Sequence, residues 1–358
     1  MGKPFLNLND VNSKQLLSKS ARGWTICLGA GINKNILPDW SDLTLNVINK
    51  TFKFNWSKAD FEKQNNSIGF GYDSWIQACL NNHLSRGEKV ASFIKILENE
   101  IYGNILIEAE NAGIRDIMVQ FLNNPRMKKT KRNKIISFFE NKYSGSTLMQ
   151  VVDVLTSKSD VYKYPCSIIT FNADTLLYSL LIAYNEDKYS TLTNPNASEP
   201  YKLILKSYHS WGDKIPIFHL HGSLFPDFKK TSRRQDGREN LIFLESSYTK
   251  VAGSMYTWAQ TNFLYYALNT KMIFLGLSMS DPNIRKWLSW TTENVNADLS
   301  LLKDQDTNAN QHLWIKPRCR ESDTTEFLQN SLVHLGVKMG WIDGYDKTKG
   351  ALLNIMEK

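Results

Sequence analysis

The sequence predicts an α/β fold: a Rossmann-like parallel sheet with helices on both of its faces. Short, almost wholly apolar segments recur along the chain, and helical patterns separate them. Such alternation is typical of parallel sheets, whose strands are buried on both faces. Strands are expected at residues 24–28, 167–171, 215–220, 272–275, 312–315 and 336–339, and helices from residue 41, at 175–183, from residue 281 and at 325–335.

One long segment, residues 53–160, differs in character from the rest of the chain. It is rich in Lys, Glu, Asn and aromatic residues, and its apolar residues follow helical spacing without any clear strand. We therefore predict a mostly helical insertion at 53–160, carried by a domain that 1–52 and 161–358 form together. Ser41 is the expected N-cap of the helix that precedes the insertion.

The composition argues against a membrane protein, a secreted protein and a zinc protein. No run of eighteen apolar residues occurs, and the first ten residues lack the apolar segment of a secretory signal. We expect a cytoplasmic protein without a membrane partner. The four cysteines are far apart and form no close pair with Cys or His, so no metal is expected.

A net charge of +8 and a pI near 9.1 raise the question of nucleic-acid binding. Much of the excess lies in two segments, 126–134 and 229–238, which we interpret as loops. Neither contains interleaved aromatic residues. Two interpretations stay open: solvated surface that faces an acidic partner, or direct contact with DNA or RNA.

The loop after the first predicted core strand reads Gly29-Ala30-Gly31-Ile32. Its glycines allow a tight turn and a close approach to a ligand, and such loops can present N–H groups to a pyrophosphate. The full dinucleotide fingerprint is absent, because Lys34 occupies the position of its third glycine. A plain strand-to-helix turn explains the two glycines equally well.

The strand expected at 167–171 ends in Asn172 and Asp174, which flank a small Ala173. Ligands of open α/β sheets bind beyond the carboxyl ends of the strands, so these polar residues are well placed for chemistry. Asp174 also fits the N-cap of the following helix. That alternative leaves Asn172 unexplained.

Two further strand ends carry polar residues. His221 follows one strand and is the better candidate for a general base, whereas His219 lies within the strand and fits a buried structural histidine. Gly276, Ser278 and Asp281 follow another strand, where a small residue and a hydroxyl suit contact with ribose or adenine. Asp281 fits a helix cap equally well.

Taken in order, these segments resemble the NAD-binding and catalytic segments of the sirtuin family. The resemblance covers about half of the chain, from roughly residue 22 to 50 and from 164 to 290. The matching residues are Gly29 to Ile32, Pro38-Asp39, Thr170 to Asp174, His221-Gly222 and Gly276 to Ser278.

At three points the sequence departs from the sirtuin deacylases, and these departures indicate one branch of the family. Asn33 stands where sirtuins usually have Ser, Trp40 follows Pro-Asp where deacylases have Phe-Arg, and no zinc-ribbon cysteines occur between 174 and 276. These details resemble the sirtuin-like NADase branch of bacterial anti-phage defence. That branch includes the Thoeris effector and subunits partnered with HerA-type ATPases or short Argonautes.

The resemblance implies a sirtuin-like fold without a zinc ribbon, and an enzyme that hydrolyses its substrate NAD⁺ to nicotinamide and ADP-ribose. It implies a homo-oligomer, gated by assembly or by a partner such as a HerA-type ATPase, a short Argonaute or another infection sensor. Two other functions stay open: a non-catalytic module that binds NAD, ADP-ribose or nucleic acid, and a zinc-free NAD-dependent protein deacylase.

The same resemblance assigns roles to the strand-end residues. His221 would be the general base, and Asn172 would hold the attacking water or the ribose. Asp39 and Asp174 would place the nicotinamide. The remaining binding residues are Gly29, Ala30, Gly31 and Ile32 for the pyrophosphate, and Gly276, Ser278 and Asp281 on the adenosine side.

Overall fold

A computed structural model describes residues 5–7, 23–157, 164–190, 200–207, 209–226, 238, 241–254, 256–300, 312–318 and 322–356. The strands are β1 (Phe5–Asn7), β2 (Trp24–Leu28), β3 (Ser167–Thr170), β4 (Tyr201–Ile204), β5 (Ile215–His219), β6 (Lys271–Leu275), β7 (His312–Pro317) and β8 (Val337–Ile342). They form one sheet in the order β1-β8-β7-β6-β2-β3-β5-β4, and every neighbouring pair is parallel.

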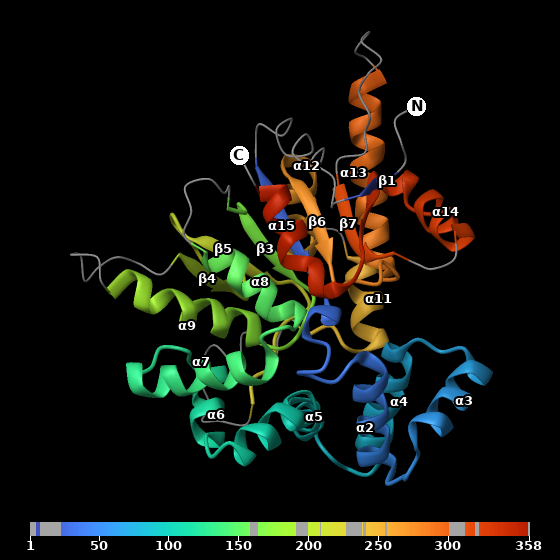
Figure 1. Cartoon of the computed structure of the whole chain (residues 1–358). Helices are drawn as coiled ribbons and strands as arrows, with labels where there is room; N and C mark the ends of the chain where they lie inside the picture. Colours follow the sequence, from blue (N-terminus) through green and yellow to red (C-terminus); the bar gives the residue numbers. More distant parts are fainter. Residues whose placement is uncertain are drawn as a thin grey trace.

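Helices account for most of the remaining described residues (Figure 1). They are α2 (Trp40–Phe52), α3 (Lys58–Ile68), α4 (Tyr72–Ser85), α5 (Val90–Asn111), α6 (Arg115–Asn123), α7 (Lys129–Tyr143), α8 (Thr147–Thr156), α9 (Leu176–Ser190), α11 (Glu245–Gly253), α12 (Trp258–Asn269), α13 (Pro282–Ser300), α14 (Ser322–Asn330), α15 (Thr348–Met356) and the short 3₁₀ helices η2 (Ala30–Asn33), η3 (Val333–Leu335) and η4 (Tyr345–Lys347).

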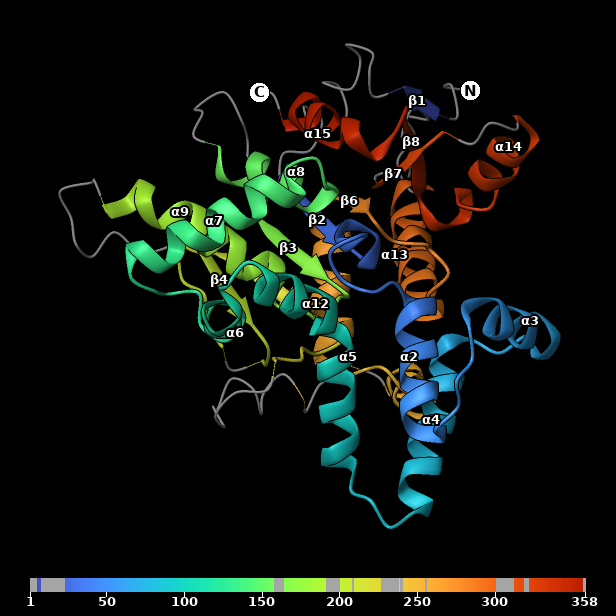
Figure 2. The same ribbon diagram turned by 60° about the horizontal axis from the view of Figure 1, so that its bottom comes forward.

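Helices cover both faces of the sheet, as the sequence predicts. Along β2, Ile26 belongs to one apolar core, shared with α8, α9 and α15, whereas the next residue, Cys27, belongs to a second core, shared with α12 and α13. Successive strand residues point to opposite faces, so each strand of a sheet covered on both faces contributes side chains to both cores. Figure 2 shows the sheet between these two helical layers.

The six predicted strands are confirmed: the bounds of β2 are as predicted, and the ends of the other five differ by up to three residues. Helix α14 is shorter than the predicted 325–335 helix, because it ends at Asn330 and a separate turn, η3, precedes a left-handed Gly336. The edge strands β1 and β4 and the helices α11 and α12 were not predicted. Both edge strands are short, and pairing with β8 and β5 defines them better than any sequence pattern does.

Residues 53–157 contain helices and turns but no strand, in agreement with a helical insertion. In Figure 1 the helices α2 to α6 lie beyond the carboxyl ends of the strands. Helix α8 instead packs on α9 and α15, over the sheet. The division of the chain into a sheet domain and an insertion stays a prediction.

The interpretation of segment 126–134 as a loop was wrong, because Lys129 begins helix α7. The helix forms because Ile135, Phe138 and Phe139 recur on one face and are buried there together with Arg132. Of the second basic segment, 229–238, only Arg238 lies within the described residues. Its guanidinium donates two hydrogen bonds, at 2.9 and 2.7 Å, to the buried Glu98 carboxylate.

None of the helices in the described part of the chain combines the length and the apolar character that crossing a membrane requires.

Candidate functional site

The sheet reverses its strand order at β2. The strands β3, β5 and β4 lie on one side of this central strand, and β6, β7 and β8 lie on the other. Such a switch point opens a crevice at the carboxyl ends of the strands, where open α/β sheets bind their ligands. All four polar segments of the sequence follow the adjacent strands β6, β2, β3 and β5, and therefore meet at this edge.

The loops after β2 and β6 touch each other through their glycines. A methyl group at Gly29 would lie 2.6 Å from the Gly276 carbonyl oxygen, and one at Gly31 would lie 2.9 Å from the same atom. Gly276 itself has a φ of +70°, in the left-handed region that favours glycine. The glycines are therefore needed for the close approach of two backbone segments.

Three backbone amides of this glycine loop already have partners inside the protein. Gly29 donates to the Leu275 carbonyl at 3.1 Å, and Gly31 donates to the Gly276 carbonyl at 2.9 Å. Ile32 donates to the Gly29 carbonyl at 3.2 Å. In this conformation those three N–H groups are not free for a pyrophosphate. Binding of pyrophosphate by Gly29 to Ile32 stays a prediction, and Ala30 is the residue of the loop that lines the pocket described next.

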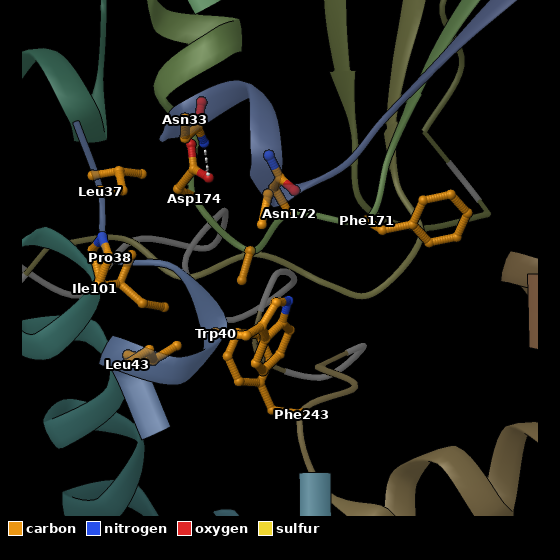
Figure 3. Close-up of a pocket in the computed structure, with 12 residues that line it drawn as sticks. Asn33, Leu37, Pro38, Trp40, Leu43, Ile101, Phe171, Asn172, Asp174 and Phe243 are labelled. Atoms are coloured by element: carbon orange, nitrogen blue, oxygen red, sulfur yellow. Dashed lines mark hydrogen bonds between the residues drawn. The ribbon is translucent and has the colours of Figure 1, made fainter. Parts of the chain in front are cut away.

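A pocket of about 50 Å³ lies where the loops after β2 and β3 meet (Figure 3). This volume exceeds the ~10–15 Å³ that one water needs, so the polar groups at its wall can meet solvent or a ligand. Asn172 and Asp174 form part of that wall. The other lining residues are Ala30, Asn33, Leu37, Pro38, Trp40, Leu43, Ile101, Phe171, Ala173 and Phe243.

The lining combines a polar end with an apolar, partly aromatic end. Trp40 and Phe243 pack with their ring centroids 4.9 Å apart. At the other end, Asn33 Nδ2 donates to Asp174 Oδ2 at 2.7 Å, and Asn172 Nδ2 donates to the Gly29 carbonyl at 3.3 Å. Apolar pockets with a few convergent polar groups are the usual form of small-molecule sites.

Hydrogen bonds connect the strand end that carries Asn172 and Asp174 to the helices of the insertion. Tyr102 of α5 accepts a hydrogen bond from Thr175 N at 3.0 Å and donates one to the Leu224 carbonyl at 2.7 Å. Thr175 Oγ1 donates to the Leu122 carbonyl of α6 at 2.8 Å. The helices of the insertion therefore help to position the polar wall of the pocket.

Burial raises the pKa of Asp174 to about 6, although hydrogen bonds from Leu176 N and Asn33 partly offset this rise. The Asp174 side chain accepts from Leu176 N at 3.0 Å. Helix α9 begins at Leu176 and the Thr175 carbonyl accepts its first helical bond, so Thr175, and not Asp174, holds the N-cap position. A carboxyl group with this pKa is mostly ionised at neutral pH. It then offers the pocket a negative charge next to an amide.

We expect the substitution Asp174→Asn to stabilise the protein above pH 6. The raised pKa means that the folded state binds this proton more tightly than the unfolded chain, so the free energy of unfolding falls as pH rises from about 4 to about 6. Removing the ionisation should recover up to about 3 kcal/mol at pH 7.5. The Asn33 amide can rotate to pair with the new side chain, since its Oδ1 has no partner among the described residues.

Urea unfolding of both proteins at pH 4 and pH 7.5 tests this expectation. The variant Asp116→Asn, in the exposed first turn of α6, controls for the change in net charge. Equal unfolding free energies of the wild type and Asp174→Asn at both pH values would contradict it.

His221 lies close to this pocket but does not line it. It is 2% exposed, and its ring packs edge-on against Phe171 at 5.0 Å and Tyr248 at 5.5 Å between centroids. Phe171 connects the pocket to His221, because it lines the pocket and also packs against the imidazole. Burial lowers the pKa of His221, and the nearby Asp281 partly offsets this shift.

His219 is buried, as its place in the strand predicts. Its Nδ1 lies 3.1 Å from the Asn172 carbonyl oxygen, and burial lowers its pKa to about 4. A histidine that is neutral at physiological pH and bonded to the backbone supports the strand end on which Asn172 is carried.

The structure leaves two predicted site residues on the surface. Asp39 is exposed and outside the pocket lining, and its Oδ1 accepts from Asp42 N at 2.9 Å. Asp39 is therefore the N-cap of α2, and the prediction of Ser41 for that role was wrong. Ser278 is also exposed, with its hydroxyl 2.6 Å from that of Ser280.

Several residues around the pocket and around His221 escaped the sequence-based prediction. Ile101 and Phe243 carry no motif and reach the pocket only through the packing of distant elements. Tyr248, which covers His221, lies on a helix that was not predicted. Asn33 and Trp40 were noticed only as departures from the sirtuin pattern, whereas both line the pocket.

Within the described residues, no cluster of three or more His, Cys, Asp or Glu side chains could hold a metal ion.

The parallel sheet and the polar loops at its switch point define a doubly wound α/β protein with a candidate ligand site at the carboxyl edge. Within this class, residues 166–335, from β3 to η3, match a family model described as a SIR2-like domain. The match supports a sirtuin-like family, and the chain has a Rossmann-like, sirtuin-like α/β fold. Domains of this family bind NAD⁺, so the match indicates NAD-related chemistry. A search of curated proteins finds no match for the chain.

Proposed function

We propose that this protein is an NAD⁺ glycohydrolase, which cleaves the nicotinamide–ribose bond to give nicotinamide and ADP-ribose. The observation that carries the proposal is the pocket at the switch point, where Asn172 and Asp174 face an apolar, aromatic wall. A planar, uncharged leaving group with a carboxamide suits such a wall. The carboxamide can donate to Asp174, which is ionised at neutral pH.

The chemistry requires little acid assistance, because nicotinamide leaves as a neutral molecule. Bond cleavage generates an oxocarbenium-like ribosyl group, as in glycoside hydrolysis. Asn172 positions the water or the ribose from the carboxyl end of β3. His221 accepts a proton from that water or from a ribose hydroxyl, and its lowered pKa keeps it unprotonated at neutral pH.

Access to His221 requires movement of the side chains around it. Phe171 and Tyr248 pack edge-on against its ring. Phe171 belongs both to the pocket wall and to the surroundings of His221, so a ligand that displaces this ring would join the pocket and the base. The catalytic assembly thus forms around the bound dinucleotide.

We also propose the biological setting that the sequence resemblance implies: a defence effector that depletes cellular NAD⁺ on phage infection. A homo-oligomer and gating by a HerA-type ATPase, a short Argonaute or another sensor belong to this proposal. The exposed lysines at the start of α7, among them Lys131 and Lys134, offer a basic surface for an acidic partner or a nucleic acid.

Incubation of the purified chain with NAD⁺ tests the enzymatic activity, with nicotinamide and ADP-ribose separated by chromatography. We expect equimolar release of both products without any acetylated peptide, and loss of release in Asn172→Ala. Release that requires an acetyl-lysine peptide would instead indicate a deacylase. Binding of NAD⁺ without release, also in the presence of a candidate partner subunit, would contradict the hydrolase.

A further inference from the structure

Asp281 faces His221 across the carboxyl edge of the sheet. Asp281 precedes α13, and His221 follows β5. Their closest atoms, His221 Nε2 and Asp281 Oδ2, are 3.7 Å apart, and the two side chains are 3% and 17% exposed. This distance exceeds a hydrogen bond, yet the Asp281 carboxylate is close enough, and little enough screened by solvent, to favour the protonated form of the imidazole.

The carboxylate of Asp281 is oriented by the backbone of its own helix. Its Oδ1 accepts hydrogen bonds from Asn283 N at 2.8 Å and Ile284 N at 3.2 Å. The cap thus occupies one carboxylate oxygen and leaves the other directed towards the imidazole. His221 Nε2 is buried and has no hydrogen-bond partner among the described residues, and Asp281 Oδ2 lies 3.7 Å from it.

The other titratable groups around His221 do not supply an alternative acceptor of this kind. Tyr248 of α11 packs edge-on against the imidazole, and Phe171 carries no polar group. Tyr248 stays protonated, because burial raises its pKa and the charges of Asp281 and Asp73 add to the rise. The negative charge that His221 meets is therefore that of Asp281.

We propose that Asp281 is a positioning residue for His221 and does not bind the adenosine. Its carboxylate holds the proton of the neutral imidazole on Nε2, which leaves the lone pair on Nδ1. When His221 takes a proton from water or from a ribose hydroxyl, the proton enters Nδ1 and the resulting imidazolium is stabilised by the Asp281 charge. The oxygen that loses the proton keeps its electron pair. The proposal rests on the proposed hydrolase function of His221.

The substitution Asp281→Asn separates this role from the helix cap, because Asn caps a helix about as well as Asp does. We expect kcat for NAD⁺ hydrolysis to fall by about 10- to 100-fold, which is less than the ~10²–10⁴-fold loss expected when the general base itself is removed. The KM should change little. The acid limb of the pH–kcat profile should shift to lower pH, because loss of the carboxylate charge lowers the pKa of His221.

Two comparisons make the test specific. Asp281→Ser also keeps a capping oxygen and should behave like Asp281→Asn, whereas Asp60→Asn removes an exposed acid from the start of α3 and should leave the kinetics unchanged. If Asp281→Asn keeps the kcat and the pH profile of the wild type, Asp281 acts only as a helix cap. If its KM rises while kcat is unchanged, Asp281 binds the adenosine instead. Either result would overturn the proposal.

A titration of His221 distinguishes failure of this proposal from failure of the hydrolase function. NMR of selectively labelled histidine, with the signal assigned from His221→Gln, reports the pKa of His221 without any substrate. A lower pKa in Asp281→Asn than in the wild type supports the pairing even if no NAD⁺ is hydrolysed. An equal pKa in both proteins would overturn it whatever the activity.

Discussion

Replacement of His221 by alanine is expected to reduce the turnover of NAD⁺ by about 10²–10⁴-fold, the usual contribution of a general base. Burial lowers the pKa of this imidazole, so the wild-type residue is a neutral base at physiological pH. Alanine offers no group that can take the proton. The measurement is kcat from nicotinamide release, with substrate binding followed separately by calorimetry.

Two further variants keep this result interpretable. His221 is buried between aromatic rings, so alanine also leaves a cavity. His221→Gln fills more of that space without serving as a base, and we expect the same loss of turnover with a melting temperature closer to the wild type. His334→Ala removes an exposed histidine of η3 and should leave turnover unchanged. Near-wild-type turnover in His221→Gln would remove His221 from catalysis.

The central strands were predictable because parallel strands buried on both faces are almost continuously apolar. Trp24 to Leu28 has this character, and all five residues are buried. The edge strand Tyr201–Ile204 is as short as a turn and contains a lysine, so its sequence does not distinguish it from a loop. Its strand conformation depends on pairing with β5, which is a tertiary effect.

The polar residues of the site were predictable for a related reason. In a parallel sheet all strands end at the same edge, so Asn172, Asp174 and His221 were expected to gather there. The chain order could not reveal that Phe171 both lines the pocket and packs against His221, or that Asp281 faces the imidazole. Those relations depend on side-chain packing between elements distant in sequence, which no local pattern encodes.

Replacement of Gly276 by alanine is expected to lower the free energy of unfolding by about 3 kcal/mol or more. The residue has a φ of +70°, which is unfavourable for alanine. A methyl group there would also lie 2.6 Å from the Ile32 backbone nitrogen, and backbone atoms cannot move aside as a flexible side chain can. Urea unfolding, followed by circular dichroism, measures the loss.

The variant Gly69→Ala isolates the part of this cost that comes from the contact. Gly69 has a φ of +74°, nearly the same as Gly276, but a methyl group there meets no atom within 4 Å. We expect Gly69→Ala to cost only about 1 kcal/mol, the price of the left-handed conformation alone. A similar cost at both positions would mean that the two loops separate easily. A much larger cost at Gly276 would show that the junction between the loops after β2 and β6, on which the geometry of the pocket depends, is held rigidly by the close approach of two backbones.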